Sequence, residues 1–190
     1  MIIGIYGKKG SGKDTFSDFI CEKYNFTKYG FGDPIKNIAS IIFGFSKEQL
    51  YGNKKEEIDP IWGIRPRDFF QKFGTDYAQF ILPTHFPEIF DCGDNKRTIW
   101  VKVFEQWYIN QKRTNPDLKV VINDVRFKHE YDIIKKLNGY VIKINREVLN
   151  TDNHISENEL DNYDNNKFKY IIENNNSKQN LYNSIVNIIN

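Results

Sequence analysis

Apolar residues occur along this chain in two patterns, which predict two kinds of structural element. The continuous apolar run at 2–6 is typical of a strand buried on both faces of a parallel sheet, and the largely apolar stretch 118–123 is a second such strand. Longer stretches such as 13–24 carry apolar residues three or four positions apart and predict helices. In chain order, we expect strands at 2–6, 26–31, 118–123, 140–145 and 170–173, and helices at 13–24, 34–43, 46–50, 66–81, 98–113, 128–137 and 177–189. Because strands and helices alternate, the pattern predicts an α/β fold, doubly wound around a parallel sheet.

The chain has 190 residues, a length that fits one compact α/β domain. We expect its core in residues 1–45 and 115–190 and a mostly helical region in 46–114. Residues 146–164 are polar, acidic and rich in amide side chains, which favours a loop or lid over a regular element. Since the sequence contains no repeat and no linker, we predict a single domain.

The charge balance argues against an extended nucleic-acid surface. There are 27 basic and 25 acidic residues, a formal net charge of +2, and no basic tail or stripe. Cys21 and Cys92 are too few for a disulfide framework and lack the spacing of a zinc site. No apolar run is long enough to cross a bilayer, and 2–6 reads as a strand and not as a signal. We therefore expect a cytoplasmic protein without a nucleic acid polymer or a membrane as partner, and the sequence leaves open whether it forms a homodimer.

Residues 7–13, Gly-Lys-Lys-Gly-Ser-Gly-Lys, have the spacing of a Walker A phosphate loop. The loop lies between a predicted strand and a predicted helix, and this context makes the motif specific. Gly7, Gly10 and Gly12 allow the backbone to curl so that successive N–H groups point inward. The positive end of the following helix and the ammonium of Lys13 then favour the β- and γ-phosphates of a nucleotide.

The residue after Lys13 is Asp14, where a standard loop has a hydroxyl, and Thr15 follows one position later. We expect Thr15 to approach Mg²⁺ directly or through water. For Asp14 two roles remain open. It either holds metal-bound waters or only favours the positive end of the helix.

An acid and two arginines follow predicted strands on the same edge of the sheet. Asp124 comes directly after the apolar run 118–123, so it is placed to hold the water shell of Mg²⁺ or the groups around an incoming phosphate. Elsewhere, an Asp in this position is usually a helix cap, and the phosphate loop at 7–13 favours the functional role. Arg126 and Arg146 could stabilise the charge on a transferred phosphoryl group, because arginine forks bind phosphate oxygens well.

A second phosphate needs cations of its own, and the helical region offers candidates. Arg67 lies near the start of the predicted helix 66–81, either gripping an acceptor phosphate or remaining in solvent. Asp33 is expected to cap the helix that Pro34 opens, which places Lys36 in its first turn. Trp100 could stack on a base, although the sequence alone favours a place in the core.

Seven short segments, in this order, resemble those of viral-type deoxynucleoside monophosphate kinases, a family of the P-loop kinase superfamily. The resemblance spans nearly the whole chain and rests on 12–15 (Gly-Lys-Asp-Thr), 33–36 (Asp-Pro-Ile-Lys), 67–76 with Arg67, Gln71 and Gly-Thr-Asp, 100–102 (Trp-Val-Lys), 124–126 (Asp-Val-Arg), Arg146, and 154–157 (His-Ile-Ser-Glu). It implies a three-layer α/β/α fold like that of nucleoside monophosphate kinases, with a helical acceptor-binding region and a lid.

The resemblance also implies ligands and site residues. ATP and Mg²⁺ would be used, with Mg²⁺ near Thr15 and Asp124, and catalytic roles would fall to Lys13, Arg126 and Arg146. His154 and Glu157 would lie in the lid. ATP would contact Gly10, Ser11, Gly12, Lys13, Asp14, Thr15 and Asn174, the last beside adenine. The acceptor would contact Lys9, Asp33, Lys36, Arg67, Asp76, Trp100 and Asp124.

The implied reaction moves a phosphoryl group from ATP to a deoxynucleoside monophosphate, giving a diphosphate and ADP. Two departures bear on nucleotide preference: Asn175-Asn176 replaces a common Asp-Gly turn, and Gly10 stands where some relatives carry a basic residue. One alternative is another small-molecule P-loop kinase, of the dephospho-coenzyme A or phosphomevalonate type. A second is a nucleotide-hydrolysing switch, although the guanine-like segment 53–56 precedes the strand of Asp124, which is the wrong order for that class.

Overall fold

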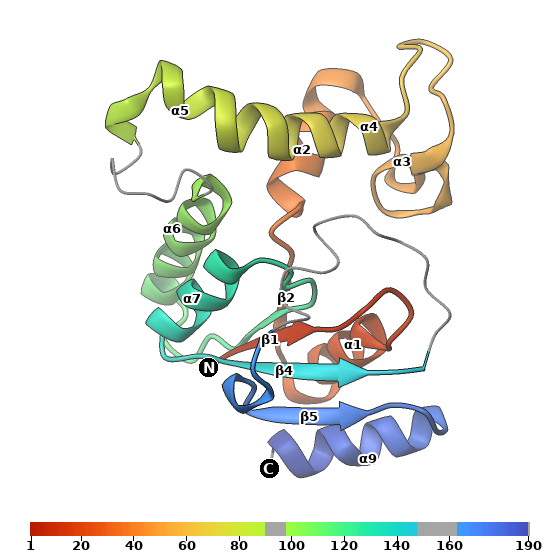
Figure 1. Cartoon of the computed structure of the whole chain (residues 1–190), viewed down its shortest axis with the longest axis vertical. Coiled ribbons are helices and arrows are strands. Elements are labelled where there is room, and N and C mark those ends of the chain that lie inside the picture. The colour runs from red at the N-terminus through yellow and green to blue at the C-terminus, as the bar shows by residue number, and fades with distance from the viewer. Residues whose placement is uncertain (90–97, 148–162, 190) are drawn as a thin grey trace. The chain divides into compact units, whose positions relative to one another are not determined.

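The computed structural model describes residues 1–89, 98–147 and 163–189. Its centre is a parallel sheet in the order β2-β3-β1-β4-β5 (Figure 1). Every neighbouring pair of strands in this sheet is parallel, which confirms the predicted fold class. The strands are β1 (Ile2–Tyr6), β2 (Thr27–Tyr29), β3 (Val120–Ile122), β4 (Tyr140–Asn145) and β5 (Tyr170–Glu173).

The middle strand β1 is buried along its whole length, as expected of a strand with helices on both sides of the sheet. Ile3 pairs with Val121 of β3 and with Tyr140 of β4. Because the strands are parallel and in register, their carboxyl ends meet at one edge of the sheet. The loops after β1, β3 and β4 all leave from this edge, and so do most of the predicted site residues of the core.

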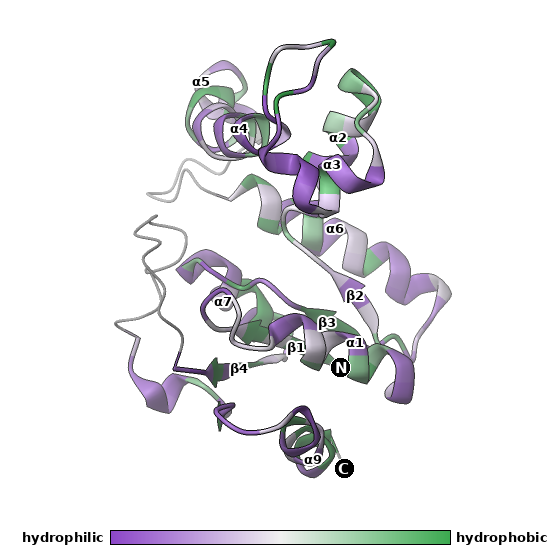
Figure 2. Ribbon diagram, turned by 90° about the vertical axis from the view of Figure 1, so that its right-hand side faces the viewer, coloured by the Kyte–Doolittle hydropathy of each residue, from purple (hydrophilic) through white to green (hydrophobic). Residues whose placement is uncertain are grey.

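Helices cover both faces of the sheet. Helices α1 (Lys13–Tyr24) and α9 (Lys178–Ile189) pack on the face formed by Ile3 and Ile5, where they share one apolar core. Gly4 points to the opposite face, because successive strand residues alternate, and there α7 (Lys128–Lys136) covers it. Figure 2 shows hydrophilic and hydrophobic turns within α7 and α9, as in helices with one buried face.

The remaining helices lie mostly between β2 and β3 in the sequence. They are α2 (Asp33–Phe43), α3 (Lys47–Tyr51), η1 (Asn53–Glu56), α4 (Pro66–Gln71), the π-helix η2 (Lys72–Ile81), α5 (Leu82–His85), η3 (Pro87–Ile89) and α6 (Ile99–Thr114), with η4 (Asn165–Lys167) before β5. The sequence predicted α2, α3 and α6 to within a residue or two. It missed the short turns η1 and η3.

Two predicted features of this region were wrong in detail. Asp33 does not cap α2, because the N-cap is Gly32 and Asp33 is the first helical residue, with no side-chain cap. The expected single α-helix at 66–81 widens into a π-helix from Lys72. Within this π-helix, the carbonyl oxygen of Gly74 accepts side-chain hydrogen bonds from Gln79 at 3.0 Å and Trp100 at 2.7 Å.

The chain divides into two compact units. A core unit contains residues 1–30 and 107–190, and a helical unit contains residues 31–106. The single kinase domain stays a prediction, as does the lid at 146–164, most of which lies outside the described residues. Among the helices that the structure describes, none has the length and apolar character needed to cross a membrane.

Candidate active site

The loop between β1 and α1 has a backbone that only glycine adopts easily at several positions. Gly10 and Gly12 have φ angles of 80° and 106°, in the region that L side chains rarely adopt. A Cβ atom on Gly12 would lie 2.5 Å from Nδ2 of Asn174, and one on Gly7 would lie 2.5 Å from the carbonyl oxygen of Ile144. The three glycines are therefore required by conformation and by space, which explains the spacing of the motif.

Lys13 begins α1, and its ammonium folds back over the loop. Nζ donates to the carbonyl oxygens of Gly7 at 2.5 Å and Lys8 at 2.8 Å. The loop is closed further by a hydrogen bond from Ser11 N to the carbonyl of Lys8, at 3.1 Å. The positive end of α1 and this ammonium thus lie together at the carboxyl edge of β1, an arrangement that suits a phosphate group.

Asn174 supports the loop from the neighbouring segment after β5. Its side chain is buried, and Nδ2 donates to the carbonyl oxygen of Ser11 at 2.8 Å. Its backbone N–H donates to the carbonyl of Asn145, also at 2.8 Å, so the residue is held at both ends. The sequence analysis placed Asn174 beside adenine, and that contact stays a prediction. What the side chain does in this structure is fix the shape of the phosphate loop.

Asp14 is held by two neighbouring strands. Its Oδ1 accepts a hydrogen bond of 2.8 Å from Asn123, at the end of β3, and lies 3.6 Å from the ammonium of Lys28, in β2. Asp14 also lies in the first turn of α1, where an acid is favoured by the helix dipole. The sequence did not single out Asn123, although its position directly before Asp124 at a strand end was the available signal.

Thr15 and Asp124 are both partly buried, Thr15 in the first turn of α1 and Asp124 two residues after the end of β3. Since β1 and β3 are adjacent and parallel, both residues belong to the same edge of the sheet. The described residues contain no group of three or more His, Cys, Asp or Glu side chains that could hold a metal. The few oxygen ligands offered here fit Mg²⁺, which keeps waters and binds substrate phosphates, better than a metal that needs a full protein cage.

Arg126 lies two residues after Asp124, between the buried side chains of Val125 and Phe127. Its backbone N–H donates to Oε2 of Glu130 at 2.7 Å. Glu130 is itself buried, and burial, reinforced by the charge of Asp124, raises its pKa to about 8. The sequence analysis did not include Glu130, because an acid in the first turn of a helix is an ordinary surface feature.

Arg146 follows β4 and reaches the phosphate loop. Its guanidinium lies 3.4 Å from the carbonyl oxygen of Gly10, and the side chain is exposed. This arginine therefore lies at the phosphate loop, and its role at a transferred phosphoryl group stays a prediction. His154 and Glu157, which were assigned to the same lid, lie outside the described residues.

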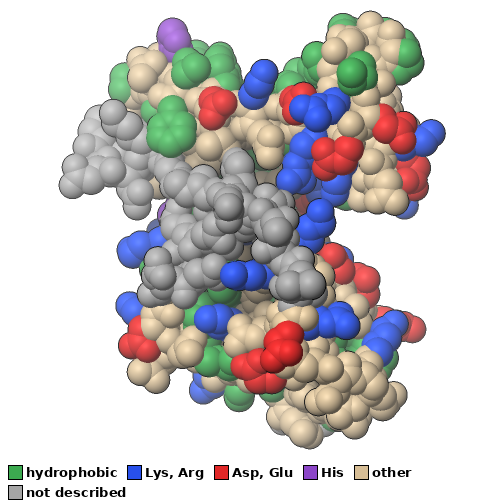
Figure 3. All heavy atoms as spheres, turned by 45° about the vertical axis from the view of Figure 1, so that its right-hand side comes forward, with side chains coloured by type: hydrophobic (Ala, Val, Ile, Leu, Met, Phe, Trp, Pro, Cys, Tyr) green, Lys and Arg blue, Asp and Glu red, His purple; other side chains and the backbone are tan. Residues whose placement is uncertain are grey.

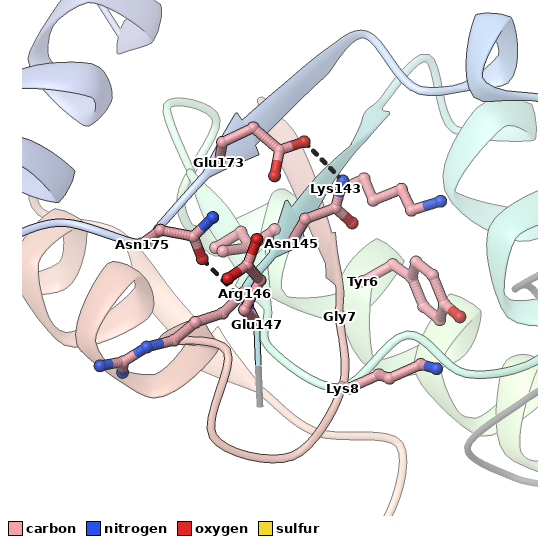
Figure 4. A pocket seen from close by; sticks show the side chains of 10 residues that line it. Tyr6, Gly7, Lys8, Lys143, Asn145, Arg146, Glu147, Glu173 and Asn175 are labelled. Carbon is pink, nitrogen blue, oxygen red and sulfur yellow. Dashed lines mark hydrogen bonds between the residues drawn. The ribbon is translucent and has the colours of Figure 1, made fainter. Parts of the chain in front are cut away.

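A pocket of about 380 Å³ opens beside the loop, at the ends of β1, β4 and β5. Figure 4 shows Tyr6, Lys8 and Lys143 on one side of this pocket and Arg146 on the other. Two hydrogen bonds shape its wall, from Asn145 Nδ2 to Glu173 at 2.8 Å and from Glu147 N to Asn175 at 2.9 Å (Figure 4). The sequence missed the lining residues Tyr6, Lys143, Asn145, Glu147 and Glu173. Their position at strand ends was the only signal for them.

The helical unit carries most of the predicted acceptor residues. Lys36 pairs with Asp33 at 3.5 Å, and its ammonium lies 4.2 Å from the ring centroid of Tyr51. Arg67 is partly buried in the first turn of α4, and Asp76 is exposed on η2. These contacts keep Lys36 and Asp33 together but leave the roles of all four residues as predictions.

Trp100 is buried in the helical unit, 7% exposed, with its indole N–H bonded to Gly74. This is the packing role that the sequence favoured over base stacking. In the core unit, Lys9 is exposed on the phosphate loop. Figure 3 shows basic and acidic side chains interspersed on the face that it presents, in keeping with the small net charge.

Comparisons with known proteins were made against families, curated proteins and solved structures. The family model for deoxynucleotide monophosphate kinase matches residues 1–59 and 42–185. A protein of Acanthamoeba polyphaga mimivirus, provisionally named deoxynucleotide monophosphate kinase, is 35% identical over 100% of this chain and 96% of its own. The deoxynucleoside-5′-monophosphate kinase of Escherichia phage T5 is 25% identical over 73% of each chain.

Among solved structures, dephospho-CoA kinase from Campylobacter jejuni has a similar fold, with a TM-score of 0.51 and 17% identity over 99% of this chain and 94% of that chain. This likeness shows the fold alone, because the identity is low. The family model and the mimivirus relative each cover nearly the whole chain. On these matches, and with the phosphate loop and its arginine described above, the chain belongs to the deoxynucleotide monophosphate kinase family.

Proposed function

We propose that this protein transfers the γ-phosphoryl group of ATP to the 5′-phosphate of a deoxynucleoside monophosphate, giving a deoxynucleoside diphosphate and ADP. The observation that carries the proposal is the glycine loop of residues 7–13, closed around Lys13 and buttressed by Asn174, in a chain of this family. Such a loop binds a polyphosphate through backbone N–H groups and leaves the terminal phosphate within reach of the lysine.

In this mechanism, an oxygen of the acceptor phosphate attacks the γ-phosphorus in line with the leaving β-phosphate oxygen. The acceptor phosphate is already ionised, so the reaction needs no strong general base. The protein contributes position and positive charge. Lys13 follows the transferred group, and Arg126 and Arg146 neutralise charge on its oxygens.

Thr15 and Asp124 would hold Mg²⁺, directly or through water, and Mg²⁺ supplies charge neutralisation at the β- and γ-phosphates. The acceptor would be bound by the cations Lys9, Lys36 and Arg67, with Asp33, Asp76, Trp100 and Asp124 nearby. Because a phosphate accepts bidentate hydrogen bonds from arginine, Arg67 is our first candidate for its clamp. The relatives are viral proteins, and we further propose that this protein works on free nucleotides in the cytoplasm of a host cell.

The experiment that tests the acceptor class is ADP release from ATP with a panel of deoxy- and ribonucleoside monophosphates, with dephospho-CoA as a comparison substrate. We expect ADP release to depend on a deoxynucleoside monophosphate. Release that depends on dephospho-CoA, or that proceeds equally without any acceptor, would favour one of the alternative classes.

A further inference from the structure

Glu130 is a buried acid that the reaction described above does not use. It is the third residue of α7 and is 5% exposed. One oxygen atom, Oε2, accepts two backbone hydrogen bonds, from Arg126 N at 2.7 Å and from Phe127 N at 3.1 Å. The carboxyl group is therefore bonded to the two peptide groups on either side of the Arg126 Cα atom.

Half of this arrangement is ordinary helix capping. Phe127 is the N-cap of α7 and has no side-chain oxygen, so Glu130 reaches back to its N–H as the Glu of a capping box does. The other half is not capping, because Arg126 precedes the N-cap and its N–H lies outside the helix. A cap can also be made by an exposed side chain, whereas Glu130 is buried at a cost in free energy.

The rest of the turn is fixed as well. Val125 N donates to the carbonyl oxygen of Ile5 in β1 at 3.1 Å, and Asn123 bonds to Asp14 at 2.8 Å. The side chains of Val125 and Phe127 are buried on either side. Arg126 is thus the partly exposed residue of a turn whose backbone is held before and after it. This turn follows β3, and the phosphate loop follows the adjacent strand β1.

We propose that Glu130 is the positioning residue of Arg126, and that its carboxyl oxygen fixes the peptide from which the guanidinium reaches the transferred phosphoryl group. This inference rests on the proposed role of Arg126 in transfer. A preorganised cation contributes more than a mobile one, because no reorganisation is needed as charge develops. Groups that orient metal-ligating side chains affect activity by about 10- to 100-fold, and we take this range as the guide for Glu130.

The test uses three single variants, Glu130→Ala, Glu130→Gln and Arg126→Ala. It also uses the double variant that carries both Glu130→Ala and Arg126→Ala. Gln keeps an oxygen that can accept both N–H groups, while Ala removes it. We expect Glu130→Ala to lower kcat by about 10-fold or more with at most about a 3-fold change in the KM for ATP, and Gln to restore kcat to within about 3-fold. In the Arg126→Ala background, Glu130→Ala should have almost no further effect.

Lys128→Ala is the matched control, because Lys128 lies on the same turn of α7, is exposed, and pairs with Asp132 at 2.8 Å. It should leave kcat unchanged. Thermal unfolding is measured for each variant, and Glu130→Asp, one methylene too short to reach both N–H groups, replaces the Ala variant if that one does not fold.

Four results would overturn the proposal. The first is a Glu130→Ala or Glu130→Asp enzyme with normal kcat, and the second is an equal loss with and without Arg126. The third is a Gln variant as slow as the Ala variant. If Arg126→Ala itself transfers phosphate normally, Arg126 has nothing to be positioned for and the inference falls, whereas the proposed function would still be judged by the acceptor panel.

Discussion

The side-chain amide of Asn123 donates a hydrogen bond of 2.8 Å to Asp14. This contact joins the end of β3 to the first turn of α1, so the turn that carries Asp124 and Arg126 is connected to the helix that follows the phosphate loop. It also gives a structural reason for an acid directly after Lys13, where a hydroxyl is the standard residue. The two roles weighed for Asp14 from the sequence can now be separated by experiment.

We expect Asp14→Ala to lower kcat by about 3- to 10-fold, because the link to Asn123 is lost. Asp14→Asn keeps an oxygen that can accept the same hydrogen bond and should stay near the wild-type value. Steady-state kinetics at several Mg²⁺ concentrations would check this. An Asn variant that needs much more Mg²⁺ than the wild type would instead indicate that the carboxylate charge holds metal-bound water.

The phosphate loop should not tolerate a side chain at Gly12. Gly12→Ala forces a left-handed backbone on alanine and drives its Cβ into Asn174, so we expect a loss of about 1–3 kcal/mol in stability and at least about a 10-fold weaker affinity for ATP. Gly32→Ala is the control, since nothing lies within 4 Å of its Cβ position and its φ is −81°. Calorimetric titration with ATP and thermal unfolding would measure both effects, and equal behaviour of the two variants would contradict the account of the loop.

Arg67 is predicted to bind the acceptor. Arg67→Ala should raise the KM for the deoxynucleoside monophosphate by about 10-fold or more, because a charge-assisted phosphate contact is lost, and should leave the KM for ATP within about 2-fold. Arg65→Ala is a nearby control, because Arg65 is exposed and pairs with Asp68 at 2.9 Å. A larger effect at Arg65 than at Arg67 would place the clamp elsewhere.

Stability should depend on pH through Glu130. Burial, and to a smaller extent the charge of Asp124, raise the pKa of Glu130 from 4.5 to about 8. The backbone hydrogen bonds from Arg126 and Phe127 and the charge of Arg126 act in the opposite direction. The folded chain then binds more protons than the unfolded chain between these values. The stabilisation that the protonated Glu130 contributes to the free energy of unfolding is therefore fully present below about pH 4.5 and is lost as pH rises to about 8. Urea unfolding at pH 5.5 and 8.5 should show that the free energy of unfolding falls less between these pH values in Glu130→Gln than in the wild type. Equal falls in the two proteins would contradict the raised pKa.

The strands were the most predictable part of the fold. The bounds of β1, β4 and β5 agree with the sequence, because each strand is a short run containing apolar residues between polar or glycine-containing turns. β3 is shorter than the predicted 118–123, since the pairing with β1 covers only Val120 to Ile122. The local pattern therefore located all three strands, and the extent of pairing with a neighbour set the bounds of β3.

Features that depend on distant partners could not be predicted in this way. In the π-helix η2, the carbonyl oxygen of Gly74 accepts a hydrogen bond from Trp100, 26 residues away, and this partner is not visible in the local pattern. Asn174 was recognised only through a family resemblance, and its bond to Ser11 joins residues 163 positions apart. For Glu130 the capping pattern was hidden, because the N-cap is Phe127 and not Ser or Thr.

The measurement that tests the central claim most directly follows the γ-phosphate itself. With ATP labelled at the γ-position and a deoxynucleoside monophosphate such as dTMP or dGMP, the products are separated and the label is located. We expect the label in the β-phosphate of the deoxynucleoside diphosphate, with equimolar ADP, and we expect Lys13→Ala to lower the rate by at least about 100-fold while the protein stays folded. Label found only as inorganic phosphate, or transfer that Lys13→Ala leaves unchanged, would contradict the account.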